Sequence, residues 1–270
     1  MITKNDLEQY KTFIDPYQIE KDYLQDLILY NIYKTTKNAF VFKGGTALSK
    51  VYHTDRFSED LDFTLQYFND FNNLGTDKEK MAYIKLTLNK SIKSIEYKIE
   101  YVQQPIMNKF GTVSSTIEIE GPRFTGRSST LQRIVFDIST NGTVLIKPTA
   151  APIIPVYAGA LNYVANVMNI SEIICEKIRA ICSMGRKHKE RDLYDIYILL
   201  GKDIKIDINL VKKKFDEVSL TFSPKLLEMN ILSINKTWKD LAPFVQHRLE
   251  EHDHVCTYVL NMLKKNNILG

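Results

Sequence analysis

The sequence of this 270-residue chain predicts an α+β fold, with a mixed β-sheet in the first part and an α-helical C-terminal domain after it. In the first part, short segments that alternate between apolar and polar residues, as β-strands do, are interspersed with helical patterns. From Ser171 onwards, helical periods prevail. We therefore expect residues 1–165 to form one domain and residues 166–270 to form a second, helical one.

The first elements alternate between helix and strand. The stretch from Gln18 to Lys37 has no glycine or proline and carries apolar residues at helical spacing, which predicts a long helix. The apolar run Phe40–Phe42 then ends at Gly44 and Gly45, which predicts a strand, a tight turn and a following helix. Further patterns predict strands at 57–65, 95–101, 112–120 and 131–139 and a helix at 78–92.

The chain changes character after these strands. The weakly polar stretch Ala150–Ile170 contains Pro152 and Pro155, so it fails as a membrane span and is expected to be a linker that enters a helix. The patterns that follow predict helices at 172–184, 190–200, 207–216, 225–232 and 237–263, the last with a break inside. No internal repeat is present, which excludes solenoid and propeller folds.

The composition excludes several classes of protein. Lysine and arginine number 36 against 32 aspartates and glutamates, and a net charge of +4 does not by itself indicate a nucleic-acid partner. Apolar residues make up 44%, enough for an ordinary core, so intrinsic disorder is not expected. Three cysteines without a CxxC pair are too few for a disulfide framework, and the first residues lack the apolar segment of a secretory signal. Both observations predict a cytoplasmic protein.

Two neighbouring motifs carry candidate chemistry. Gly44 and Gly45 precede a predicted helix, where the main chain can approach a phosphate closely, and Thr46 adds a hydroxyl donor. Asp60 and Asp62 lie on one face of a predicted strand, and adjacent carboxylates repel each other unless a cation such as magnesium lies between them. Taken alone, the glycine pair is more often a plain strand-to-helix turn. The aspartates are equally often the solvated face of an edge strand.

Other candidate residues lie further along the chain. Asp137 interrupts an otherwise apolar strand, so it is either a third metal ligand or the end of a strand that faces water. Lys177 lies among apolar neighbours on a predicted helix, where it either finds a partner or a phosphate or extends from the helix edge. Arg186, Lys187 and Lys189 form a basic cluster that suits an RNA backbone or is a solvated loop.

Two further groups of polar residues have structural interpretations. Arg191 and Asp195 are four residues apart, so we expect an ordinary helix ion pair, with Asp192 pointing elsewhere. His252 and His254 lack partners at metal-ligand spacing, so we expect them at the surface.

The motif Gly-Gly-Thr-Ala-Leu-Ser-Lys from residue 44 and the motif Arg-Phe-Ser-Glu-Asp-Leu-Asp-Phe from residue 56 resemble those of the DNA polymerase β-like nucleotidyltransferases. More narrowly, the chain resembles the AbiEii/AbiGii toxin family, which includes the MenT-like toxins of type IV toxin–antitoxin systems. The blocks at 20–23, 171–180 and 191–197 support the narrower match.

The resemblance implies a polymerase β-like catalytic domain over residues 1–165 and a helical domain over residues 166–270 that completes the active-site cleft. It also implies the roles of individual residues. These are nucleotide binding for Gly44, Gly45, Thr46, Lys50 and Lys177, binding of Mg²⁺ or Mn²⁺ for Asp60, Asp62 and Asp137, and catalysis for Ser58, Asp60, Asp62, Lys177 and Asp192.

The implied activity is the transfer of a nucleoside monophosphate from a nucleoside triphosphate to an acceptor. The resemblance implies RNA, at the 3′ end of a tRNA, as that acceptor, and a toxin of a toxin–antitoxin or phage-defence system whose antitoxin is encoded nearby. The alternatives are transfer to a protein or a small molecule, and a catalytically idle module that binds nucleotide or RNA. The presence of both Asp60 and Asp62 counts against the idle module.

Overall fold

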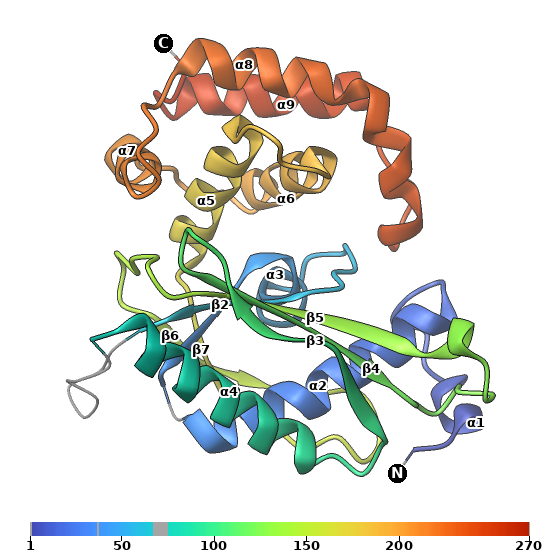
Figure 1. Ribbon diagram of the computed structural model, residues 1–270. Helices are drawn as coiled ribbons and strands as arrows, with labels where there is room; N and C mark the ends of the chain where they lie inside the picture. The colour runs from blue at the N-terminus through green and yellow to red at the C-terminus, as the bar shows by residue number, and fades with distance from the viewer. Residues whose placement is uncertain (1, 37, 67–74, 270) are drawn as a thin grey trace. The chain divides into compact units, whose positions relative to one another are not determined.

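The computed structural model of the chain describes residues 2–36, 38–66 and 75–269 (Figure 1). Contacts between residues divide the chain into two compact units. The sheet unit comprises Met1–Val51, Phe57–Val144 and Pro148–Met168, and the helical unit comprises Tyr52–Arg56, Leu145–Lys147 and Asn169–Gly270. Two short segments from the first part of the sequence therefore belong to the helical unit.

The sheet unit is built on a mixed sheet that has seven strands in the described residues. They are β1 (Phe40–Lys43), β2 (Leu61–Leu65), β3 (Ile99–Met107), β4 (Thr112–Ile119), β5 (Gln132–Ser139), β6 (Thr149–Ile153) and β7 (Tyr163–Val167). Their order is β3-β4-β5-β2-β1-β7-β6, with β1 parallel to β7 and β2 parallel to β5. The other neighbouring pairs are antiparallel, so the predicted α+β fold with a mixed sheet is confirmed.

Helices cover both faces of this sheet. They are α1 (Lys4–Leu7), α2 (Pro16–Thr36), α3 (Gly44–Tyr52), α4 (Asp77–Lys93) and the short 3₁₀ helix η2 (Ser128–Thr130). Figure 1 shows α2 and α4 on one face and α3 on the other. Leu24, Ile28 and Ile32, at four-residue spacing on α2, are buried, and α2 packs on β5 and β7. Phe42 and Phe63 on the paired strands β1 and β2 are fully buried as well.

The helical unit contains α5 (Ile170–Cys182), α6 (Lys189–Gly201), α7 (Ile208–Asp216), α8 (Pro224–Ser233), the 3₁₀ helix η3 (Ile234–Phe244) and α9 (His252–Lys265). Helix α5 packs on α6 and α7, and α6 packs on α9. Asp207 and Ser223 cap the first main-chain N–H groups of α7 and α8. Within the described ranges, no helix combines the length and the apolar character that a membrane crossing requires.

Most of the predicted elements are present, with ends shifted by a few residues. The break expected inside residues 237–263 lies between the end of η3 at Phe244 and the start of α9 at His252. Lys37, the end of the first predicted helix, lies outside the described residues. The strand expected from Phe57 begins only at Leu61.

The expected linker at Ala150–Ile170 is wrong, because it contains β6 and β7. Pro152 lies on β6 at the edge of the sheet, where a missing N–H breaks no ladder.

Candidate active site

A row of polar side chains crosses four neighbouring strands of the sheet. Lys43 on β1 lies opposite Asp62 on β2, and Asp62 lies opposite Asp137 on β5. Asp137 in turn lies opposite Ser114 on β4. Because residues directly opposite each other in a sheet point to the same face, the four side chains share one face. Two aspartates from distant parts of the sequence thereby become neighbours.

We call Asp62 and Asp137 the carboxylate pair. Both are partly exposed, and Ser114 Oγ donates a hydrogen bond of 2.5 Å to Asp137 Oδ1. Adjacent carboxylates disfavour joint ionisation unless a cation lies between them. Carboxylate oxygens are also the ligands that magnesium accepts together with phosphate oxygens and water, so the donor chemistry of the pair fits a divalent ion. Asp60 lies before β2, outside the row.

No group of three or more His, Cys, Asp or Glu side chains in residues 2–36, 38–66 and 75–269 is placed so that it could hold a metal ion.

The turn between β1 and α3 approaches the carboxylate pair closely. Gly44 has a φ of +72°, in the left-handed region that L side chains rarely adopt. A Cβ atom at this position would lie only 2.1 Å from Asp62 Oδ2 and 2.8 Å from Asp62 Cβ. Both the main-chain conformation and the available space therefore require glycine at position 44. Gly45, the next residue, is buried in the first turn of α3.

Thr46 and Ser58 contribute through contacts to the main chain. Thr46 is buried, and its Oγ1 donates a hydrogen bond of 2.5 Å to the carbonyl oxygen of Asp60. Ser58 is half-buried, and its carbonyl oxygen accepts a hydrogen bond of 3.0 Å from Gln25 Nε2. The Thr46 hydroxyl therefore holds the residue that precedes β2. Its contact with a triphosphate stays a prediction.

Lys50, which was predicted to bind nucleotide, lies between two carboxylates of α2. Its Nζ is 2.7 Å from Asp22 Oδ1 and 2.9 Å from Asp26 Oδ1, and its side chain is only 5% exposed. We call these three residues the Lys50 cluster. Burial raises the pKa of Asp26 to about 6, and Asp22 adds to the rise although Lys50 opposes it. One lysine therefore balances two acids in this cluster.

Lys177 and Asp192 belong to a chain of charges in the helical unit, the Lys177 cluster, whose members are buried except for Arg186, which is 46% exposed. Lys177 Nζ is 2.9 Å from Asp192 Oδ1 and 2.8 Å from Asp195 Oδ2. Arg56 donates to both oxygens of Asp195 at 2.8 and 2.9 Å. Arg186 donates to both oxygens of Asp192 at 2.9 and 3.2 Å. Cations and carboxylates therefore alternate along the cluster, with a cation at each end.

These alternating charges decide the pKa values in the Lys177 cluster. Burial alone would raise the pKa of Asp195, but Arg56 and Lys177 outweigh it and lower the value to about 2. Burial likewise opposes the charge of Asp192, yet Lys177 and Arg186 keep its pKa below the usual value. The two aspartates raise the pKa of Lys177 against the effect of its burial. These three groups are therefore charged near neutral pH.

The geometry of α6 corrects one expectation about its side chains. Asp192 and Asp195 are three residues apart and share a helix face, so both reach Lys177, and the prediction that Asp192 points elsewhere is wrong. The guanidinium of Arg191 lies over the ring of Phe244, 4.2 Å from its centre. The expected pair of Arg191 with Asp195 stays a prediction.

The basic loop and the histidines differ in exposure. Arg186 and Lys187 are exposed, and Lys189, the first residue of α6, is partly exposed. Arg186 is also held by the Lys177 cluster through Asp192. His254 is exposed as expected. His252 is buried, with its Nε2 3.1 Å from the Sγ of Cys256, so the expected surface position is wrong for this residue.

Sequence reasoning missed several residues that contact the site. Arg56 could have been found from the sequence, because it begins the motif Arg-Phe-Ser-Glu-Asp that also contains Asp60. The contact of Asp195 with Lys177 could also have been expected, because Asp195 is three residues from Asp192 on the same helix. Nothing in the sequence indicated a role for Ser114 or Gln25. Ser114 contacts Asp137 on a neighbouring strand, and Gln25 contacts main-chain carbonyl groups, so neither contact depends on a spacing in the sequence.

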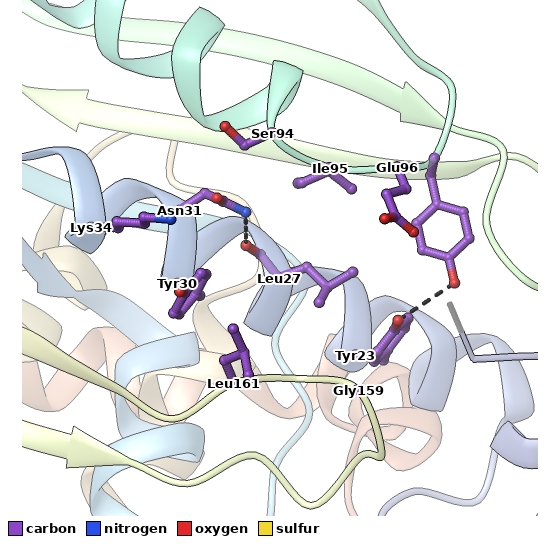
Figure 2. A pocket seen from close by; sticks show the side chains of 11 residues that line it. Tyr23, Leu27, Tyr30, Asn31, Lys34, Ser94, Ile95, Glu96, Gly159 and Leu161 are labelled. Carbon is purple, nitrogen blue, oxygen red and sulfur yellow. Dashed lines mark hydrogen bonds between the residues drawn. The ribbon is translucent and has the colours of Figure 1, made fainter.

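A cavity of about 400 Å³ lies along α2, and Figure 2 shows it from close by. Three tyrosines line it, Tyr23, Tyr30 and Tyr97, and the hydroxyls of Tyr23 and Tyr97 lie 3.5 Å apart. Leu27 and Leu161 add apolar surface. None of the residues predicted for the site lines this cavity.

Comparison with known proteins identifies a family whose model matches most of this chain. The model of the family described as nucleotidyl transferase AbiEii toxin, type IV toxin–antitoxin system, matches residues 27–254. A search of curated proteins found no significant match.

Solved structures share the fold. MenT4, a nucleotidyltransferase toxin from Mycobacterium tuberculosis, is similar with a TM-score of 0.66 and 19% identity, over 100% of this chain and 91% of that one. JHP933 from Helicobacter pylori has a TM-score of 0.56 and 17% identity, over 95% of this chain and 94% of its own. A putative nucleotidyltransferase from H. pylori has a TM-score of 0.57 and 18% identity, over 95% and 99% of the two chains.

Proposed function

This chain belongs to the AbiEii nucleotidyltransferase toxin family of type IV toxin–antitoxin systems, and we propose that it transfers a nucleoside monophosphate to RNA, at the 3′ end of a tRNA. In this reaction the acceptor hydroxyl oxygen forms a bond to the α-phosphorus of a nucleoside triphosphate. The bond from that phosphorus to the β-phosphate breaks, and pyrophosphate and the hydroxyl proton leave. The observation that carries the proposal is the carboxylate pair, Asp62 and Asp137, beside the Gly44 turn.

We assign metal binding to the carboxylate pair, which would share the ion with phosphate oxygens and water. The roles of Asp60 as a further ligand and of Ser58 beside the ion stay predictions, because no third carboxylate is placed with the pair in the described residues. A bound Mg²⁺ or Mn²⁺ ion would offset the charge of the phosphates and lower the pKa of the acceptor hydroxyl. Ser114 holds Asp137 in place for this role through its short hydrogen bond. The identity of the metal as magnesium is part of the proposal.

Triphosphate binding is assigned to the start of α3. The main-chain N–H groups at Gly45 and Thr46 lie at a helix N-terminus, which favours negative charge. The left-handed Gly44 lets the main chain pass close to Asp62, which supports a phosphate site next to the metal ligands. The predicted nucleotide contact of Lys50 has no such support, since Asp22 and Asp26 balance its charge.

From the helical unit we assign Lys177 and Asp192 to nucleotide contact and catalysis. The Lys177 cluster has three cations and two carboxylates, so it carries one net positive charge. A positive cluster suits the stabilisation of charge that develops on phosphates. Lys187 and Lys189 lie next to Arg186 in the sequence and add to its positive charge, as an RNA backbone requires, and the affinity for RNA is then expected to fall with salt.

Membership of the family implies an antitoxin partner. We propose that a neighbouring gene encodes it and that the pair acts in phage defence. Expression of the chain alone is then expected to arrest growth, and co-expression of the neighbouring gene to relieve the arrest. Growth arrest that the neighbouring gene leaves unchanged contradicts this assignment.

Labelling of RNA tests the activity directly. The purified protein is incubated with total cellular RNA, Mg²⁺ and each of the four α-labelled nucleoside triphosphates in turn, next to the variant Asp62→Asn. Asp77→Asn is the matched control, because Asp77 lies on α4 with a side chain that is 68% exposed. We expect label on tRNA-sized RNA with the wild type and the control, and none with Asp62→Asn.

The other outcomes separate the alternatives. Pyrophosphate release with label on a protein or on a small molecule would show that the acceptor is a protein or a small molecule and not RNA. Nucleotide binding without pyrophosphate release contradicts nucleotidyl transfer and leaves a binding module.

A further inference from the structure

The segment just before β2 lies outside the strands that the structure describes, yet three of its consecutive main-chain carbonyl oxygens receive hydrogen bonds from side chains. Gln25 on α2 donates from Nε2 to the carbonyl oxygens of Ser58 and Glu59, each at 3.0 Å. Thr46 on α3 donates to the carbonyl oxygen of Asp60 at 2.5 Å. Ser58, Glu59 and Asp60 are partly buried, and main-chain groups shielded from water need hydrogen-bond partners, so these two side chains supply the hydrogen bonds that a neighbouring strand supplies elsewhere in the sheet.

The side chain of Gln25 is fully buried, and only one end of its amide is used. Its Nε2 carries two N–H groups and contacts two carbonyl oxygens. Its Oε1 is buried without a hydrogen-bond partner in the part of the chain that the structure describes. An unpaired buried acceptor is unfavourable, so packing by itself does not favour glutamine here. The amide of Gln25 therefore contributes through the two hydrogen bonds that it donates to the carbonyl oxygens of Ser58 and Glu59.

Helix α2 is a fixed support for this amide, because it is anchored on both sides of Gln25. On one side, the carboxylate of Glu20 accepts a hydrogen bond of 2.6 Å from the main-chain N–H of Arg123. On the other side, the hydroxyl of Tyr33 donates a hydrogen bond of 3.1 Å to the carbonyl oxygen of Phe40 on β1. A shift of α2 relative to the sheet would break these contacts.

A second side chain of α2 contacts the same segment. Lys21 Nζ lies 3.4 Å from Glu59 Oε1, with 16% and 34% of the two side chains exposed. Residues 21 and 25 are one helical turn apart and point to the same side of α2. The helix therefore contacts the segment through both a charged and a neutral group.

We propose that Gln25 is a positioning residue, which together with Thr46 holds the main chain before β2 and so sets the direction of Asp60 and Asp62. The inference rests on the proposed function, because it takes Asp62, together with Asp137, as a metal ligand. Ligands of a shared ion must be held to within about 0.5 Å of their working geometry. Asp137 is held by Ser114, and Gln25 has the corresponding role for Asp62 on β2, through the segment that precedes this strand.

The test compares Gln25→Met, which keeps the length of the side chain and removes both N–H groups, with Asn31→Leu. Asn31 is the matched control, because it also carries an amide on α2 but donates within the helix to the carbonyl oxygen of Leu27, at 2.9 Å. Binding of Mn²⁺ is measured by the electron paramagnetic resonance signal of free Mn²⁺, without nucleotide. The kcat and KM of nucleotidyl transfer and the melting temperature are measured on the same proteins.

We expect Gln25→Met to weaken Mn²⁺ binding about tenfold and to lower kcat about 10–100-fold, as loss of a group that orients metal ligands does. The KM for the nucleoside triphosphate should stay within about twofold, because the phosphate-binding turn at Gly44 is unchanged. Asn31→Leu should behave as the wild type in all these measurements. If Gln25→Met does not fold, Thr46→Val removes the third hydrogen bond and is expected to weaken Mn²⁺ binding in the same direction.

Asp62→Asn separates the two ways in which the inference can fail. If Asp62→Asn abolishes Mn²⁺ binding while a folded Gln25→Met binds Mn²⁺ and turns over as the wild type does, Gln25 is not a positioning residue. If Asp62→Asn itself leaves Mn²⁺ binding unchanged, the proposed metal site is wrong and the inference falls with it. A loss in Gln25→Met that Asn31→Leu shares would indicate a general effect on α2 and overturn the specific role.

Discussion

Two buried lysines of this protein each lie between two aspartates, but their surroundings differ in net charge. In the sheet unit, Lys50 is the one cation among the described residues that pairs with Asp22 and Asp26. In the helical unit, the Lys177 cluster has three cations for two carboxylates. The pKa values follow this difference: burial raises that of Asp26 to about 6, while Arg56 and Lys177 lower that of Asp195 to about 2 in spite of burial.

The comparison shows that burial does not by itself decide whether an acid is charged. Asp26 and Asp195 are both almost completely buried, at 4% and 1% exposure. The number of cations within contact distance decides the direction of the shift, because each desolvated carboxylate needs its own partner. The sheet unit therefore holds an acid that takes up a proton easily, and the helical unit holds acids that do not.

The largest effect is expected when the Lys177 cluster loses a cation. Arg56→Met removes one of the two cations described in contact with the buried Asp195, and we expect a loss of about 4–5 kcal/mol in the free energy of unfolding at pH 7. Urea denaturation measures it. Adding Asp195→Asn to the variant should recover most of the loss, because the uncompensated charge is then removed.

Arg133→Met is the control for Arg56→Met. Arg133 pairs with Glu118 on the surface of the sheet, with a side chain that is 65% exposed. Its loss should cost less than about 1 kcal/mol. Equal losses in the two variants would contradict the importance of burial for the Arg56 pair.

A smaller and pH-dependent effect is expected in the Lys50 cluster. Lys50→Met leaves the buried Asp26 and the partly buried Asp22 without their lysine, and we expect a loss of about 3–4 kcal/mol at pH 8. The loss should shrink by up to about 1.4 kcal/mol per pH unit towards pH 5, because Asp26 can then take up a proton. A loss that is the same at pH 5 and pH 8 would be inconsistent with the raised pKa of Asp26.

A smaller effect is expected in the pH dependence of the free energy of unfolding of the wild type, through the titration of Asp26. The folded pKa of Asp26, about 6, lies above its ordinary value of 3.8, so the folded state binds the proton more tightly. The corresponding stability is present below about pH 4 and is lost as the pH rises through 6, which amounts to about 3 kcal/mol. Asp26→Asn should remove this part of the pH dependence in urea denaturation between pH 4 and 7. An unchanged profile would show that another group titrates.

The contribution of Asp195 to the pH dependence of the free energy of unfolding is expected to be smaller than that of Asp26 and opposite in sign. Its folded pKa of about 2 lies below the ordinary value of 3.8, so its contribution is present above about pH 4. That contribution, about 2 kcal/mol, is lost as the pH falls from 4 to 2. Acid unfolding of Asp195→Asn followed by circular dichroism should lack this component, and a midpoint identical to the wild type would contradict the assignment.

The sequence was sufficient for the features that depend on local patterns. Alternation and helical spacing predicted most strands and helices, because each element must bury one face. The paired glycines and the Asp-x-Asp motif marked candidate residues of the site, because few residue types permit a left-handed turn or supply metal ligands. The pairing of β6 with β7 was not predicted. Ala165, Asn166 and Val167 on β7 are all buried in succession, so this strand lacks the alternation of apolar and polar residues that marks a strand in the sequence.

Only the tertiary structure decided which polar groups meet. The pairing of β2 with β5 brings Asp62 beside Asp137, and the pairing of β4 with β5 adds Ser114. Gln25 reaches the segment before β2 from a helix, and no spacing in the sequence encodes that contact. The physical reason is that periodicity states which face of an element is buried, whereas strand order, register and helix docking decide which residues share that buried space.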